Sequence, residues 1–231
     1  MAAREFGMLW IELRGMWNKN IVSLDSKEVA EAQRILKKYE LRVTDIASPL
    51  FKTAWKDDPR AKEKQPADFH ASFTFDQQGE VLDRAIEMAK AFQTDRIRCF
   101  DFFKLEDPAP HRDAINQILL DAANKCGKNE LILVLENDGG LNTATGAEAA
   151  KVLNAVQFPY FMLNWDPGNM PQMVRSHIRT VTICCRRTAS ATAIAKTSQG
   201  KAKRNGHRWG KASLIGKDSF ARFNVMVITS R

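Results

Sequence analysis

Two acidic residues, Glu136 and Asp166, have the type and position that could support chemistry. Glu136 ends a run that is otherwise apolar (131–135), and Asp166 follows the next apolar run (160–165). If these runs are neighbouring parallel strands, the two carboxylates lie at one edge of a sheet and repel each other unless a cation or a shared proton intervenes. A divalent ion with oxygen ligands would relieve that repulsion. For either acid alone, the alternative is to cap a helix or to face water.

Such an ion could polarise a sugar carbonyl while a carboxylate removes the adjacent proton. We therefore predict Glu136 as the catalytic residue, and Glu136 and Asp166 as ligands of a divalent metal ion; Mn, Mg, Co and Zn are not distinguished by the sequence. Further residues are expected to bind the substrate, namely Arg98 from a neighbouring strand, together with Glu12, Asn137, Asn164 and Trp165. For Arg98 the alternative is an ordinary salt bridge, and for Trp165 it is the apolar core.

Short apolar runs alternate with amphipathic stretches up to residue 169, which predicts βα units and a parallel sheet. The expected strands cover residues 8–13, 42–47, 96–102, 131–135 and 160–165. One expected helix begins at a capping box (25–28), and others cover 79–92, 111–126, where Gly127 is the expected C-cap, and 145–156. Residues 49–75 form a long polar loop, a length more typical of functional loops.

The order of these elements is compatible with a doubly wound sheet or with a barrel. A doubly wound sheet usually carries a Gly-rich phosphate turn after a strand, and the sequence contains none. A barrel places its chemistry at the carboxyl ends of the strands, which is where the polar residues occur. The sequence therefore favours an α/β barrel.

The bulk composition narrows the class of protein. The chain has 231 residues and no run of about 18 apolar residues, so neither a transmembrane helix nor a membrane partner is expected. Its start lacks the apolar core of a signal peptide, and its four cysteines show no paired spacing. These features predict a cytoplasmic protein with reduced thiols.

The net charge of +8 is unevenly distributed along the chain. Residues 1–169 hold 22 Lys and Arg against 26 Asp and Glu, whereas residues 170–231 hold 13 Lys and Arg and a single acid, Asp218. Such an asymmetry is typical of a basic arm that binds nucleic acid. The composition of this tail nevertheless favours another cause.

Four strings of the sequence resemble a known family: LRVTDIASPLFK (41–52), DRIRCFDFFKLED (95–107), LVLENDGGLNTATGAEAAKVL (133–153) and FMLNWDPGN (161–169). They are similar to bacterial sugar phosphate isomerases/epimerases of the xylose-isomerase-like TIM barrel family, over about residues 2–169. The resemblance implies that Glu136 and Asp166 are the first two metal-binding carboxylates, and that a His and a Glu from later strands complete the site. It also implies an eight-stranded barrel whose first strand this chain lacks. The expected fold is an incomplete (β/α) TIM barrel over 1–169.

The alternation stops in the basic tail, residues 170–231, which is expected to be irregular and poorly ordered. The genetic code suggests why. When each codon is read from its third base, Met170-Pro171 must give Ala and Cys184-Cys185 must give Leu. With synonymous bases chosen to match the family, the tail can be read as its continuation, including an HCHCKD strand that would carry the missing His. We therefore predict a one-base shift of the reading frame near Asn169 and Met170.

Three functions follow as alternatives. The first is a metal-dependent isomerase or epimerase that binds a small sugar or sugar phosphate, impaired because half of its metal site is missing. The second is a barrel-type endonuclease or a basic nucleic-acid-binding protein, which the tail supports but the acidic residues 1–169 do not. The third is a gene product without activity. The sequence does not indicate the sugar or the oligomeric state.

Overall fold

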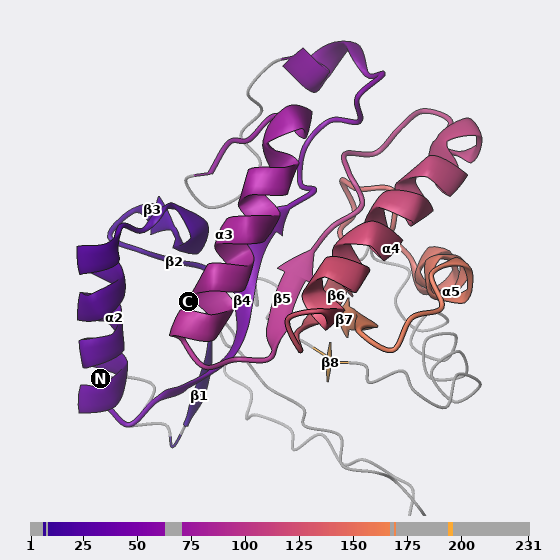
Figure 1. The fold of residues 1–231 in the computed structure, drawn as a ribbon. Coiled ribbons are helices and arrows are strands. Elements are labelled where there is room, and N and C mark those ends of the chain that lie inside the picture. The colour runs from indigo at the N-terminus through magenta and orange to yellow at the C-terminus, as the bar shows by residue number, and fades with distance from the viewer. Residues whose placement is uncertain (1–6, 8, 63–70, 167–168, 170–193, 196–231) are drawn as a thin grey trace, which may run out of the picture.

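The central feature of the fold is a six-stranded parallel sheet whose strands follow one another in chain order (Figure 1). The structure is a computed structural model that describes residues 7, 9–62, 71–166, 169 and 194–195. The strands are β1 (Trp10–Leu13), β4 (Arg42–Leu50), β5 (Arg96–Cys99), β6 (Ile132–Glu136), β7 (Phe161–Trp165) and β8 (Ile194–Ala195). A doubly wound sheet reverses its order at a switch point, whereas a (β/α) barrel does not. Within the described part of the chain, the fold is therefore an incomplete barrel.

Helices connect successive strands and cover the sheet, as the alternating pattern predicts. They are α2 (Ser26–Lys38), α3 (Gln78–Ala91), α4 (Arg112–Gly127) and α5 (Gly146–Ala155). Helix α3 packs against β4 and β5, α4 against β6, and α5 against β7. Figure 1 shows α3 and α4 crossing the same face of the sheet. This arrangement leaves the opposite face of the strands for the inside of the barrel.

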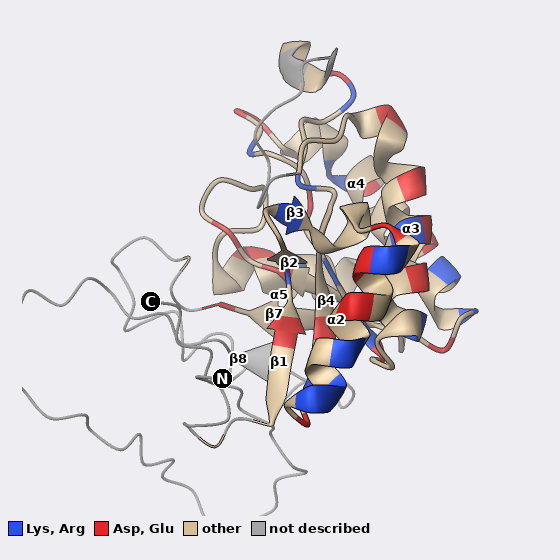
Figure 2. Ribbon diagram, turned by 90° about the vertical axis from the view of Figure 1, so that its left-hand side faces the viewer, with Lys and Arg blue, Asp and Glu red and all other residues tan. Residues whose placement is uncertain are grey.

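Two of the helices begin at the capping boxes that the sequence predicts. Asp25 and Glu28 cap α2, and Thr145 and Glu148 cap α5, each through reciprocal side-chain and backbone hydrogen bonds. Helix α2 carries charges of both signs (Figure 2), and its Glu28 forms a 2.6 Å ion pair with Lys19, which lies before the helix in the chain. Among the described residues, no helix is long and apolar enough to cross a membrane.

Short elements complete the described chain. A two-stranded hairpin of β2 (Gly15–Met16) and β3 (Lys19–Asn20) follows β1. Its turn residues Trp17 and Asn18 have φ of 51° and 59°, as a two-residue hairpin turn requires. Single-turn helices are η1 (Ile21–Ser23), η2 (Pro59–Lys62), η3 (Phe75–Gln77) and η4 (Ala109–His111). The sequence did not predict the hairpin, because Trp is an unusual residue for a left-handed turn.

The structure corrects two local predictions. Strand β4 continues through Pro49 to Leu50, although Pro49 was expected to begin a loop. The prediction that Gly127 caps α4 is wrong, because Gly127 is the last residue of the helix and Lys128 is its C-cap. A Cβ atom there would lie 2.9 Å from Cδ2 of Tyr160, so close packing is what restricts the size of the residue. In the turn that follows α4, the residue with a left-handed backbone is Glu130, with φ of 59°.

The two faces of each strand differ in chemistry because side chains alternate across a sheet. On the face toward the helices, the fully buried side chains of Ile97, Leu133 and Leu135 belong to the main apolar core. On the opposite face of the same strands lie the buried polar side chains of Arg98 and Glu136. The strands thus hold the fold together with one face and present charged groups on the other.

Of the basic tail, the structure describes only Ile194 and Ala195, which form β8 and pair with Asn164 and Trp165 of β7. The remainder of residues 170–231 lies outside the described residues, and so does the predicted boundary between the barrel and a poorly ordered tail.

Candidate active site

Glu136 and Asn164 lie side by side at the carboxyl ends of β6 and β7. They are register partners in the parallel pair, and Asn164 Nδ2 donates a 3.0 Å hydrogen bond to Glu136 Oε2. Both residues are buried, with exposed fractions of 5% for Glu136 and 1% for Asn164. Strand β6 therefore places the Glu136 carboxylate on the inside of the barrel, next to the side-chain amide of Asn164 from the following strand.

Arg98 of β5 is the cation that balances the buried acids. Its Nη1 atom lies 3.7 Å from Glu136 Oε2 and 3.7 Å from Glu12 Oε1, which comes from β1. Its other nitrogens donate to the main-chain oxygens of Ala47 (3.0 Å) and Ser48 (3.2 Å). The guanidinium is thus held by β4 while it faces carboxylates from two other strands, which favours a fixed position.

Asn137 places Asp166 at the same edge of the sheet. Asn137 Nδ2 donates to the main-chain oxygen of Asp166 at 2.9 Å, and the Asp166 amide donates to Asn137 Oδ1 at 2.7 Å. Asn169 Nδ2 adds a 3.0 Å hydrogen bond to the Asn137 main chain. Asn137 is fully buried and its amide is used by these backbone contacts, so it holds the segment around Asp166 in place.

The structure thus links four predicted residues directly, namely Glu12, Arg98, Glu136 and Asn164. Asn137 and Asp166 form the adjoining pair. Trp165 is not brought to this group, because its buried ring packs with Ala149 of α5 and Leu163 in a small apolar cluster on the helix-facing side.

Sequence reasoning missed Lys52, which lies two residues after the end of β4. Its Nζ atom lies 3.0 Å from Asp138 Oδ2 and 4.6 Å from the centre of the Phe100 ring. Arg98 lies 4.8 Å from the centre of the same ring, so both cations gather at one aromatic side chain. The Asp138 pKa is lowered, since hydrogen bonding from the Gly140 amide and the charges of Lys52 and Arg98 outweigh the effect of burial. Lys52 is part of the string SPLFK. The sequence predicted that the strand ends at residue 47, so Lys52 was not recognised as lying close to the end of a strand.

Two bulky residues adopt left-handed backbone conformations beside this site. Phe51 has φ of 61° and Phe102 has φ of 70°, both rare for residues with large side chains. The Phe102 amide donates to the Phe51 oxygen at 3.0 Å, and the two rings lie 5.2 Å apart. The Phe51 amide donates to Gln78 Oε1 at 2.7 Å. These contacts stabilise the turns after β4 and β5. The first of these turns contains Lys52, so the contacts also help to position its side chain.

Asp101 also follows a sheet strand, β5, but its side chain contacts residues outside the Glu136 group. It is fully buried and accepts from Thr143 Oγ1 (2.6 Å), the Thr143 amide (2.9 Å) and Arg112 Nη1 (2.9 Å). Burial raises the pKa of Asp101 to about 6, against the lowering effect of these donors. Asp101 thus connects α4 to the turn before α5.

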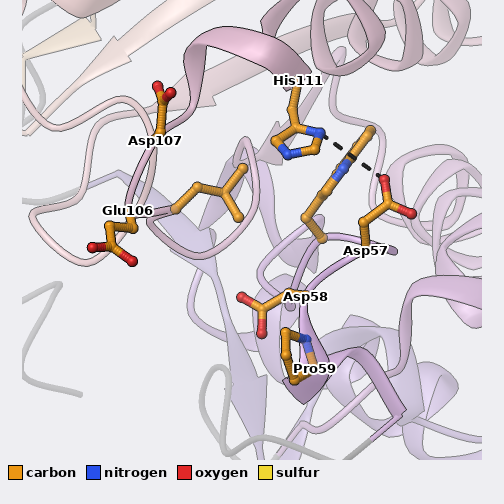
Figure 3. A pocket seen from close by; sticks show the side chains of 8 residues that line it. Asp57, Asp58, Pro59, Glu106, Asp107 and His111 are labelled. Atoms are coloured by element: carbon orange, nitrogen blue, oxygen red, sulfur yellow. Dashed lines mark ion pairs between the residues drawn. The ribbon is translucent and has the colours of Figure 1, made fainter.

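A pocket of about 350 Å³ lies further out, between the segments that follow β4 and β5; we call it the rim pocket (Figure 3). It is lined by Trp55, Asp57, Asp58, Pro59, Leu105, Glu106, Asp107 and His111. The His111 ring points toward Asp57, with Nδ1 4.0 Å from Oδ2. None of the predicted site residues lines this pocket, so its acidic lining is separate from the Glu136 group.

The residues at the carboxyl end of the sheet partly fit a divalent ion. In the described part of the chain, no group of three or more His, Cys, Asp or Glu side chains is arranged to hold a metal ion. Glu136 nevertheless ends β6 and Asp166 follows β7, so both acidic residues come from the same end of two neighbouring strands. Asn164 Oδ1 is a buried oxygen without a hydrogen-bond partner among the described residues. Oxygen donors of this kind suit hard divalent ions.

A parallel sheet in chain order, with polar residues at the carboxyl ends of its strands, defines a barrel protein of the TIM class. The chain belongs to the xylose isomerase-like TIM barrel family, whose model matches residues 1–208. A comparison with curated proteins found no match.

Solved structures share the fold at low sequence identity. The chain is similar to an AP endonuclease, family 2, from Brucella melitensis (TM-score 0.61, 12% identity, 89% of this chain and 76% of that chain). It is similar to the IOLI protein with a binding zinc atom (TM-score 0.59, 11% identity, 84% and 64%). It is also similar to D-allulose 3-epimerase from Methylomonas sp. in complex with D-allulose (TM-score 0.58, 18% identity, 85% and 64%). The chain therefore spans less than two thirds of the length of the last two proteins.

Proposed function

We propose that this chain derives from a divalent-metal-dependent isomerase or epimerase acting on a sugar or sugar phosphate. The observation that carries the proposal is the buried Glu136 carboxylate, which meets Asn164 and Arg98 at the carboxyl ends of the strands. Buried carboxylates inside a barrel are costly for folding alone and are typical of ligand sites. Relatives of the same fold that contain zinc or D-allulose agree with this choice of chemistry.

In this proposal each residue has a defined task. A bound ion would polarise the substrate carbonyl. Glu136 and Asp166 hold the ion, and the Glu136 carboxylate is the group placed to take a proton from the adjacent carbon. Arg98 and Glu12 lie 3.7 Å apart and supply charged groups toward sugar hydroxyls. Asn137 keeps the Asp166 segment in position through two backbone hydrogen bonds.

We further propose that the chain as translated is impaired, because the family's third and fourth metal ligands are not present in frame. The support is the composition of residues 170–231, whose shifted reading resembles the family's continuation. Sequencing the gene across the codons of Asn169 and Met170 tests this directly. An unshifted frame in independent reads, together with tail peptides detected by mass spectrometry, would contradict it.

An activity screen tests the function. The gene with its frame restored is expressed beside the present chain, and both are assayed on aldo- and keto-sugars and their phosphates with Mn²⁺, Mg²⁺, Co²⁺ or Zn²⁺. We expect metal-dependent isomerisation or epimerisation from the restored protein and at least a hundredfold less from the present chain. A restored protein that binds no divalent ion would refute the proposal.

A nucleic-acid-binding function is the second candidate, and the observation that favours it is the basic tail with 13 Lys and Arg. Gel shifts at increasing salt, with the full chain and with residues 170–231 deleted, separate the two functions. Salt-dependent binding that requires the tail and discriminates among DNA structures would support this candidate. The isomerase proposal predicts binding without such discrimination, or no binding.

A further inference from the structure

Asn164 carries a buried polar atom that the fold does not use. The residue is 1% exposed, and its Oδ1 atom has no hydrogen-bond partner among the described residues. A buried carbonyl oxygen without a partner costs about 1–3 kcal/mol of stability. Such an oxygen at the carboxyl end of a barrel strand is a candidate ligand group, because the cost is recovered when something binds there.

The orientation of this amide is fixed by its neighbour. Asn164 Nδ2 donates to Glu136 Oε2 at 3.0 Å. Rotating the amide by half a turn would place its oxygen against a carboxylate oxygen. The Glu136 carboxylate therefore determines which end of the Asn164 amide is the nitrogen and which is the oxygen. Because both ends share one carbon atom, Oδ1 remains close to the Glu136 carboxylate, while Asp166 comes two positions after Asn164, directly after the end of β7.

We propose that Asn164 Oδ1 is a direct ligand of the divalent ion, beside the carboxylates of Glu136 and Asp166. This inference rests on the proposed function of the site. Amide oxygens are ordinary ligands of hard divalent ions and often accompany carboxylates around them. Asn164 then has two tasks, since its nitrogen orients one ligand through Glu136 and its oxygen is another. A chain without the later family ligands keeps three protein oxygens at this position.

Asn142 offers a matched control, because it is also a buried asparagine near the carboxyl end of the sheet but has both ends of its amide satisfied. Its Nδ2 donates to the Asp101 oxygen at 2.8 Å, and its Oδ1 accepts from the Leu105 amide at 3.0 Å. The same substitution can therefore be made at two buried asparagines that differ in whether the oxygen is already used.

The test uses the full chain, asparagine labelled with ¹³C at the side-chain carbonyl, and Mn²⁺ as the probe. Electron–nuclear double resonance should detect a ¹³C coupling in the wild type and in Asn142→Asp. The coupling should be absent in Asn164→Asp, which we expect to bind Mn²⁺ about tenfold more tightly because it adds a charged ligand. If that variant does not fold, Asn164→Ser, which adds no charge, makes the same assignment.

The outcomes are distinguishable. Mn²⁺ bound to the wild type without a ¹³C coupling would show that a water molecule occupies the place of the amide oxygen, and this inference alone would fail. A coupling that persists in Asn164→Asp and Asn164→Ser would assign it to another asparagine, with the same result. A wild type that binds no Mn²⁺ by calorimetry or resonance would refute this inference, whereas the proposed function fails only if the frame-restored protein also binds no divalent ion.

Discussion

The two faces of the parallel sheet differ in how their residues depend on one another. Toward the helices, Leu133 and Leu135 pack among apolar neighbours, and each contributes roughly in proportion to the surface it buries. Toward the inside, Arg98 meets Glu12 and Glu136 from two other strands, and none of these charges is tolerable there by itself. Packing is thus a sum of separate contributions, whereas the polar face works as a unit assembled from distant parts of the chain.

The largest effect is expected from Arg98→Met. This substitution removes the cation between two buried carboxylates and leaves the Ala47 and Ser48 oxygens without their donor. Breaking a buried ion pair in this way costs about 3–5 kcal/mol of the free energy of unfolding. Urea denaturation measures the loss, and Arg98→Lys should recover part of it. A loss below about 1 kcal/mol would show that the inner face does not act as a unit.

The second effect is on the helix-facing side. Leu135→Ala creates a cavity at a fully buried position and should lower the free energy of unfolding by about 3 kcal/mol. Affinity for Mn²⁺, measured by calorimetry at a temperature where the variant is folded, should not change. A substantial loss of affinity would mean that the two faces of β6 are not separable.

Asp101 offers a pH test on a buried acid away from the candidate site. Its pKa of about 6 in the folded protein exceeds the ordinary value of 3.8, so the folded state binds the proton more tightly than the unfolded state. Stability relative to Asp101→Asn should therefore be greatest at low pH and fall as pH rises from about 4 to about 6, by at most about 3 kcal/mol. Thermal unfolding of both proteins between pH 4 and 7 measures the difference. A constant difference would show that the Thr143 and Arg112 donors fully offset burial.

The smallest change in stability is expected one residue after Leu135. Glu136→Gln keeps the shape of the side chain and removes one of the two negative charges beside Arg98. Since Glu12 remains as the partner of Arg98, the free energy of unfolding should change by less than about 1 kcal/mol. Its Mn²⁺ affinity should nevertheless fall at least tenfold, because a charged ligand is lost. The pair Leu135→Ala and Glu136→Gln would then separate the two faces in adjacent residues, and equal effects of both substitutions on binding would contradict that separation.

The sequence predicted the parts of the structure that depend on local pattern. Apolar periodicity located the strands and helices, and the Asp25 and Thr145 capping boxes were correct because their bonds lie within four residues. The barrel class followed from where polar residues ended the apolar runs. The family comparison confirms that class, while the roles of Glu136 and Asp166 remain predictions.

What the sequence could not predict depends on three-dimensional neighbours. Trp165 was expected to bind substrate, but the parity of β7 turns its ring toward Ala149. Lys52 was overlooked because Pro49 suggested that the strand had ended, although β4 continues to Leu50. The left-handed Phe51 and Phe102 have no local signal, since contacts between distant segments hold them. In each case a neighbour from another segment decided the outcome.

The sequential order of the strands has a consequence for how the polypeptide is made. Because β4, β5, β6 and β7 each pair with the sheet strand that precedes them in the chain, every new unit finds its partner already synthesised. Structure of this kind can accumulate from the amino end as the chain leaves the ribosome, since each strand has to close only the connection to its immediate predecessor in the sheet. A change of reading frame after β7 would then affect the preceding strands and helices only through the contacts that β7 makes. Partial assembly of the sheet from β1 to β7 is therefore expected whatever sequence follows it.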